Sequence, residues 1–193
     1  MLVNVIGMGY IGLPTALMMA SHGVNVIGTD YNAERINELN HGGKAFEEKG
    51  LAELFEAARA AGIRFSEQYR KADVYIVSVP TPYIKQTRKI DPHYVVTACQ
   101  SVLDICDDNA ILVVESTISP GTIDKFVRPL LNGRKIRLAH APERIIPGNM
   151  LRNSSITPAR SASMTKKPAR SSRGSMPPSA KARSLSRTSA PRK

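Results

Sequence analysis

Residues 2–30 read LVNVIGMGYIGLPTALMMASHGVNVIGTD, and this stretch decides the fold of the 193-residue chain. An apolar run over residues 2–6 leads directly into a glycine-rich turn. A helical pattern follows, and a second apolar run ends on an acid, Asp30. The order strand, glycine turn, helix, strand and carboxylate is what a dinucleotide pocket requires. We therefore expect this segment to bind a dinucleotide.

Each residue type in the glycine turn has a physical reason. Gly7 lets the chain turn tightly out of the strand, and Gly9 lets the backbone approach a pyrophosphate. Gly12 lets the helix pack closely on the sheet, and Tyr10 and Ile11 complete the predicted cofactor-binding turn. The helix N-terminus then offers unpaired N–H groups and a partial positive charge to the phosphates.

The acid after the second apolar run selects the kind of dinucleotide. Asp30 lies 18 residues beyond Gly12 and can accept both hydrogen bonds of an adenosine ribose diol. A carboxylate there would repel a 2′-phosphate, so NAD is favoured over NADP. A lone GxGxxG pattern also fits a purely structural turn, but the surrounding strand, helix and acid favour the dinucleotide interpretation.

The rest of the first 150 residues alternates between apolar strands and helical patterns. Helices are expected over residues 32–40, 51–61, 91–106 and 122–131, and strands over residues 63–66, 72–79, 110–115 and 136–141. This alternation predicts an α/β fold with a doubly wound parallel sheet, a Rossmann-type domain. Polar residues follow the strand ends, where such sheets bind ligands. They are Asp30, Thr81, Ser116, Thr117 and Glu143.

The formal net charge of +11 is not spread along the chain. Residues 1–150 hold 16 Lys and Arg against 16 Asp and Glu, whereas residues 151–193 hold 11 Lys and Arg and no acid. The first 150 residues therefore have the charge balance of an ordinary globular domain. The N-terminus lacks a basic region, and Gly and Pro interrupt its apolar stretch. These features argue against a signal peptide or membrane span and favour a cytoplasmic protein.

Five motifs in order resemble the UDP-glucose/GDP-mannose dehydrogenase family over about residues 1–150. They are GMGYIGLP (7–14), TD (29–30), VPTP (79–82), ESTISPGT (115–122) and APERIIPG (141–148). The PERxxPG form is most similar to the branch that oxidises UDP-N-acetylmannosamine. The PEF sequence and second glutamate of the UDP-glucose and GDP-mannose enzymes are absent.

The resemblance implies a two-step, four-electron oxidation of a sugar C6 alcohol to a carboxylate, with two NAD reduced. It implies a nucleotide-sugar substrate and a homo-oligomer. It places Pro80 and Thr81 on the adenosine side of the cofactor site, beside the glycines and Asp30. It assigns Thr117 to position a catalytic water and Glu143 to assist acid/base steps. Without the motifs, Thr117 would be a hydroxyl that satisfies a helix start, and Glu143 a solvated loop acid.

The family's essential lysine, asparagine and cysteine nucleophile belong to a second domain whose motifs these 193 residues lack. Cys99 and Cys106 lie seven residues apart in a predicted helix and match no such motif. Buried packing is the expected role of both thiols, and a disulfide between them would span too great a distance. We therefore expect the chain to be a truncated cofactor-binding half, inactive alone. The four histidines show no metal-ligand spacing, so no metal site is predicted.

Residues 151–193 contain 11 Ser and 5 Pro with few large apolar side chains, which predicts a disordered tail. Three interpretations remain open: a basic tail that binds nucleic acid or anionic lipid, a linker, or a frameshifted sequence. The abrupt break within a motif-rich region favours the frameshift. The tail has no aromatic residue to stack on bases, which argues against nucleic acid.

Overall fold

The computed structural model describes residues 1–43, 46, 48–86 and 88–143. The end of the fifth motif and the whole of residues 151–193 lie outside this range. The predicted disorder of the tail and the domain boundary at residue 150 therefore stay predictions.

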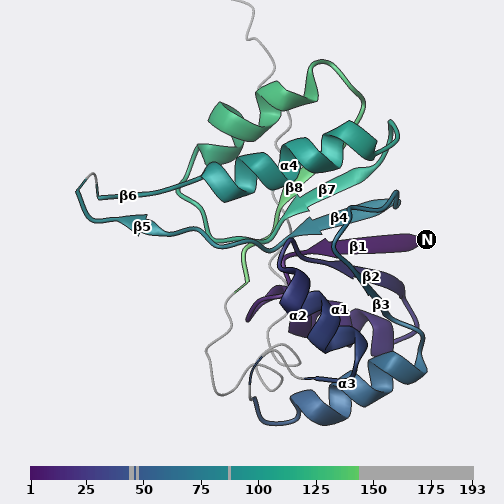
Figure 1. The fold of residues 1–193 in the computed structure, drawn as a ribbon. Helices are drawn as coiled ribbons and strands as arrows, with labels where there is room; N and C mark the ends of the chain where they lie inside the picture. Colours follow the sequence, from purple (N-terminus) through teal and green to yellow (C-terminus); the bar gives the residue numbers. More distant parts are fainter. Residues whose placement is uncertain (44–45, 47, 87, 144–193) are drawn as a thin grey trace, which may run out of the picture.

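A six-stranded parallel sheet forms the centre of the domain (Figure 1). Its order is β3-β2-β1-β4-β7-β8, and every neighbouring pair is parallel. The strands are β1 (Leu2–Ile6), β2 (Asn25–Thr29), β3 (Arg64–Ser66), β4 (Val74–Val77), β7 (Ile111–Val114) and β8 (Arg137–His140). Because the chain builds outward in one direction from β1 and then in the other from β4, a topological switch point lies between these strands. The predicted α/β, doubly wound sheet is confirmed.

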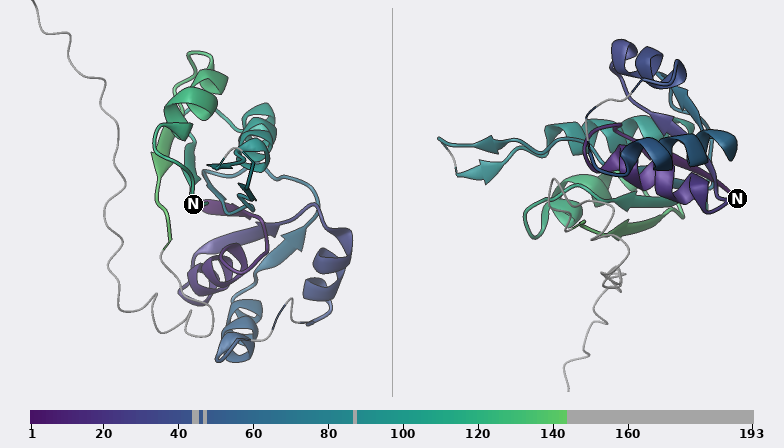
Figure 2. Two further views of the ribbon diagram at one scale, coloured as in Figure 1. Left: turned by 90° about the vertical axis from the view of Figure 1, so that its left-hand side faces the viewer. Right: turned by 90° about the horizontal axis from the view of Figure 1, so that it is seen from below.

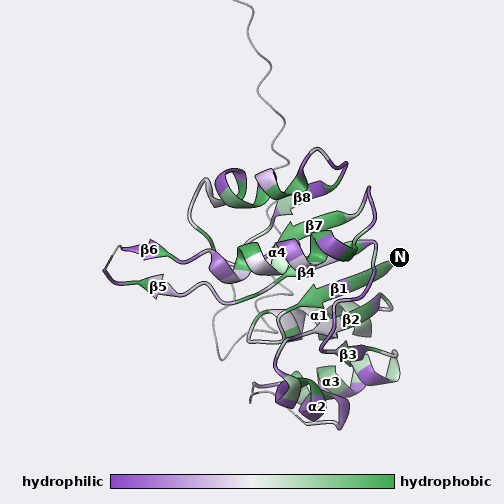
Figure 3. Cartoon of the chain, turned by 45° about the horizontal axis from the view of Figure 1, so that its top comes forward, coloured by the Kyte–Doolittle hydropathy of each residue, from purple (hydrophilic) through white to green (hydrophobic). Residues whose placement is uncertain are grey.

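Helices cover both faces of the sheet, as Figures 1 and 2 show. The helices are α1 (Gly12–Ser21), α2 (Ala33–Asn40), α3 (Leu51–Ala60) and α4 (His93–Ile105). Val3 and Val5 of β1 pack in the cluster with α1, α2 and α3, whereas Tyr75 and Val77 of β4 pack in the cluster with α4. Strands β1, β4 and β7 are apolar along most of their length (Figure 3), and in β1 and β2 side chains on both faces are buried.

The last predicted helix differs from the expectation. Residues 122–131 form a π-helical turn, Ile123–Val127, that continues as a 3₁₀ turn, Arg128–Leu131. Pro129 has no N–H to donate to the carbonyl of Lys125, so a regular α-helical ladder cannot run through this segment. Pro129 is visible in the sequence, but the prediction of one helix over residues 122–131 did not take it into account and was wrong in helix type.

One helix start and one hairpin also differ from the prediction. Helix α4 begins at His93 rather than at Asp91, and the Asp91 carboxylate accepts a hydrogen bond from the His93 backbone N–H at 2.9 Å. A β-hairpin that was not predicted, β5 (Tyr83–Ile84) and β6 (Lys89–Ile90), projects from the domain (Figures 1 and 2). Its two-residue strands are too short to produce a readable alternation of apolar and polar residues.

Both thiols are buried and neither forms a disulfide, as predicted. Cys99 lies within α4, and Cys106 immediately follows it. Among the described residues, no helix has the length and apolar character needed to cross a bilayer.

Candidate functional site

The glycine turn lies at the carboxyl end of β1, tight against two neighbouring strands. Gly7 has a φ of +95° and donates its N–H to the carbonyl of Thr29 at 2.7 Å. A Cβ on Gly7 would collide with the carbonyl oxygen of Ser78, and one on Gly12 would collide with the carbonyl oxygen of Gly7. The two glycines therefore let the turn, the helix start and the end of β4 pack directly on one another.

The middle glycine differs from the other two. A Cβ on Gly9 would meet no atom of the described residues within 4 Å, so the space above this backbone is open in that part of the chain. Helix α1 starts beside it without a side-chain cap among the described residues, and Pro14 in its first turn carries no N–H that needs a partner. An open approach to an uncapped helix N-terminus fits a pyrophosphate.

The Asp30 carboxylate is held against the glycine turn. Asp30 is only 5 % exposed, and its Oδ2 accepts hydrogen bonds from the backbone N–H of Met8 at 2.7 Å and from Arg35 Nη1 at 3.2 Å. Its Oδ1 accepts the backbone N–H of Asn32 at 2.9 Å. A carboxylate offers about four acceptor positions, and these three contacts leave one for a hydroxyl of the ribose diol, rather than the two that the sequence led us to expect.

Arg35 is a site residue that the sequence pattern did not predict. It lies in the first turn of α2, where the Asn32 side chain accepts its backbone N–H at 3.0 Å, as expected of an N-cap. The cap sets the start of the helix, and this start places the guanidinium beside Asp30. The sequence feature that could have identified Arg35 is its position three residues after Asn32, the predicted N-cap.

A second buried carboxylate, Glu115, joins the ends of β4 and β7 to helix α1. It follows β7 and is 9 % exposed. Its Oε1 accepts the hydroxyl of Thr15 from α1 at 3.2 Å, and its Oε2 accepts the hydroxyl of Ser78, which follows β4. Burial raises the pKa of the Glu115 carboxyl above its ordinary value, the hydroxyls of Ser78 and Thr15 lower it, and the nearby charge of Glu143 raises it.

Ser116, the residue after Glu115, links the end of β7 to the segment that contains Pro80 and Thr81. Its hydroxyl donates to the carbonyl of Val79 at 2.7 Å, which holds the segment leading to Pro80 and Thr81 against the end of β7. Thr117 follows directly and is exposed, so its hydroxyl can reach a bound molecule.

Glu143 approaches the same edge from β8. It is half-buried, and its charge contributes to raising the pKa of the Glu115 carboxyl. His140, at the end of β8, lies with Nε2 3.3 Å from the carbonyl of Ser116. The ends of β1, β2, β4, β7 and β8 thus contribute to one polar edge, as the strand-end pattern predicted.

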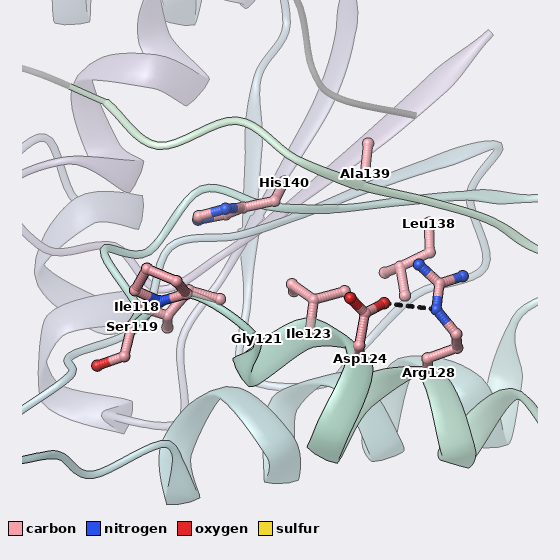
Figure 4. Close-up of a pocket in the computed structure, with 10 residues that line it drawn as sticks. Ile118, Ser119, Gly121, Ile123, Asp124, Arg128, Leu138, Ala139 and His140 are labelled. Atoms are coloured by element: carbon pink, nitrogen blue, oxygen red, sulfur yellow. Dashed lines mark hydrogen bonds and ion pairs between the residues drawn. The ribbon is translucent and has the colours of Figure 1, made fainter. Parts of the chain in front are cut away.

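A separate hollow of about 440 Å³ lies beside the outer strand β8 (Figure 4). It is lined by the turn before the π-helical segment Ile123–Val127 and by Leu138, Ala139 and His140. Asp124 and Arg128 pair across its rim at 2.7 Å. None of the glycines at positions 7, 9 and 12 lines it, nor does Asp30, so it is distinct from the glycine turn.

Comparison with known proteins identifies the fold's relatives. Residues 1–162 match the model of the UDP-glucose/GDP-mannose dehydrogenase family, NAD binding domain. The chain belongs to this family. The resemblance seen in the five motifs is thereby confirmed, and so is NAD as the cofactor of the matched domain.

Relatives within the family carry one recurring name. The chain is 40 % identical over 154 residues to a UDP-N-acetyl-D-mannosamine dehydrogenase of Methanococcus maripaludis, covering 78 % of this chain and 36 % of the relative. The solved UDP-N-acetyl-mannosamine dehydrogenase of Staphylococcus aureus superposes with a TM-score of 0.75 at 40 % identity, covering 79 % of this chain and 39 % of that one. The solved UDP-D-ManNAc dehydrogenase of Pyrococcus horikoshii superposes with a TM-score of 0.73 at 34 % identity, covering 79 % of this chain and 38 % of that one. The chain spans little more than a third of each relative.

Proposed function

We propose that this chain is the NAD-binding half of a nucleotide-sugar 6-dehydrogenase that oxidises UDP-N-acetylmannosamine. The family match supports the cofactor, and the names of relatives at about 40 % identity support the sugar. When bound, NAD would accept hydride from the C6 carbon of the sugar. The protein that contains this half would work in the cytoplasm as a homo-oligomer.

The observation that carries the proposal is the hydrogen bond between Asp30 Oδ2 and the Met8 N–H. It couples the ribose-recognising carboxylate to the turn that would hold the pyrophosphate. One carboxylate therefore sets the position of both contacts. Because Asp30 is buried beside this backbone, a 2′-phosphate would be repelled.

The remaining predicted residues take their roles from where they lie on the polar edge. Pro80 and Thr81 would line the adenosine side, as the family resemblance implies, and Ser116 holds the preceding residue, Val79, in place. In the whole protein, exposed Thr117 would position a water, and Glu143 would exchange protons with the substrate. Both act on a substrate whose other contacts belong to a second domain.

The 193 residues lack the cysteine motif that supplies the family's nucleophile, and burial raises the pKa of the Cys99 thiol to about 12. Neither thiol can replace that nucleophile. We therefore expect this chain to bind NAD but to form no NADH when UDP-N-acetylmannosamine is added. NADH formation by the purified chain would contradict this proposal.

Calorimetric titration of the chain with NAD, and separately with NADP, tests the cofactor site. Asp30→Ala should weaken NAD binding by about tenfold or more, since it removes the ribose contact and frees the Met8 N–H. Glu34→Gln, an exposed acid on the same helix as Arg35, is the matched control and should leave binding unchanged. Equal NAD affinity in the Asp30→Ala variant would overturn the assignment.

A further inference from the structure

Glu115 has no role in the motif-based assignment, although it is among the most buried acids of the domain. Both carboxylate oxygens accept hydroxyl hydrogen bonds, one from Thr15 and one from Ser78. A carboxyl group that only accepts on both oxygens is arranged as the ionised form. These two hydroxyl donors beneath the start of α1 stabilise the negatively charged form of Glu115, whereas burial raises the pKa of its carboxyl.

This charge lies at the topological switch point. Ser78, its partner, follows β4, and the Ser78 carbonyl packs against Gly7 of the glycine turn. Dinucleotides cross such sheets between β1 and the neighbouring strand on the other side of the switch point. Glu115 follows β7, the next strand beyond β4, so it would lie one to two strand spacings, roughly 5–10 Å, from a dinucleotide that crosses the sheet there.

Oxidised and reduced NAD differ in charge only at the nicotinamide, which is cationic when oxidised and neutral when reduced. Their pyrophosphates and riboses are the same. A nearby carboxylate therefore attracts the oxidised ring and leaves the reduced ring without this attraction. Repulsion between the carboxylate and the pyrophosphate affects both forms equally, so it cancels in the ratio of their dissociation constants.

We propose that the Glu115 carboxylate makes this site bind oxidised NAD more tightly than reduced NAD. The inference rests on the proposed NAD-binding function and extends it to the choice between the two redox states. In a protein that consumes oxidised NAD and releases reduced NAD, such a preference favours exchange of product for fresh cofactor.

The expected size follows from Coulomb's law. Two unit charges roughly 10 Å apart, at an effective dielectric constant of about 20 to 40, change a dissociation constant by about 4- to 17-fold. Glu115→Gln removes the charge and keeps the shape of the side chain. The ratio of the dissociation constant of NADH to that of NAD should therefore fall by a factor in this range.

Both constants are measured by calorimetric titration of the 193-residue chain at pH 8. Glu115→Gln should weaken NAD binding more than NADH binding, and Glu115→Asp, which keeps the charge, should preserve the ratio even if both affinities fall. Glu56→Gln, an exposed acid on α3, is the control and should change neither constant. Circular dichroism shows whether each variant is folded.

Three outcomes are distinguishable. If Glu115→Gln lowers the ratio and Glu115→Asp does not, the inference holds. If Glu115→Gln weakens both affinities equally, Glu115 is only structural and the inference fails, while the NAD-binding function stands. If the unaltered chain binds neither form, the proposed function fails and the inference falls with it. Should Glu115→Gln not fold, Glu115→Met provides a second neutral side chain of similar volume for the same comparison.

Discussion

Asp30 Oδ2 accepts the backbone N–H of Met8 at 2.7 Å, across 22 residues of sequence. This bond joins the end of β2 to the glycine turn after β1. The strand, turn, helix, strand and acid of residues 2–30 are therefore a physically connected unit as well as a sequence pattern. A change at the acid will reach the turn, and a change in the turn will reach the acid.

Two glycine substitutions separate ligand binding from folding. Within the part of the chain that the structure describes, a Cβ on Gly9 meets no atom within 4 Å, and Gly9 is not among the glycines with positive φ. Gly9→Ala should therefore change the free energy of unfolding by less than about 1 kcal/mol, yet weaken NAD binding by about tenfold or more, since the methyl group occupies the open approach. Urea denaturation and calorimetry measure the two effects.

Gly12→Ala is the contrasting variant. Its Cβ would collide with the carbonyl oxygen of Gly7, a backbone atom that cannot move aside without disturbing the turn. We expect a loss of roughly 2–4 kcal/mol in the free energy of unfolding, together with loss of NAD binding. A stable Gly12→Ala chain, or a Gly9→Ala chain with unchanged affinity, would contradict the geometry of the turn.

The stability of the domain should depend on pH through Glu115. Burial raises the pKa of this carboxyl in the folded state, so the folded chain binds the proton more tightly than the unfolded chain. The stabilisation from this proton is fully present below the unfolded pKa and is lost as pH rises through the folded pKa.

The difference in unfolding free energy between the unaltered chain and Glu115→Gln isolates this effect, because all other groups titrate in both proteins. The difference should favour the unaltered chain most near the low end of a urea series from about pH 4 to 8, and should shrink as pH rises. A difference that grows with pH would mean that the hydroxyls of Ser78 and Thr15 outweigh burial.

Both thiols should be unreactive while the chain is folded. With the pKa of Cys99 raised to about 12, only about one molecule in ten thousand carries a thiolate there at pH 8. Burial also raises the pKa of Cys106. A thiol-specific chromogenic reagent should therefore label neither residue until denaturant is added, after which two thiols per chain should react. Rapid labelling of the folded chain would reopen the question of a nucleophile.

The sequence predicted those parts of the site that are local in the chain. Residues 2–30 form one βαβ unit whose turn, helix and acid follow each other at fixed spacing, so the pattern and the structure agree. The strand-end positions of Thr117 and Glu143 followed from long apolar runs. Contacts between distant segments left no such pattern, and Glu115 bonds to Thr15 across 100 residues.

Other misses had local causes. Pro129 changed the helix type of residues 123–131, because a missing N–H redirects the hydrogen-bond ladder without ending the helical path. Arg35 was overlooked because its role depends on the direction of α2, which the Asn32 cap sets. The direction of α2 relative to Asp30 is known only from the folded structure.

A crystal structure of this chain with NAD tests the central claim most directly. The account predicts the pyrophosphate over Gly9 at the N-terminus of α1, with the adenosine ribose diol hydrogen-bonded to Asp30. Density for NAD elsewhere, such as in the hollow beside β8, or an Asp30 carboxylate without ribose contact, would contradict it.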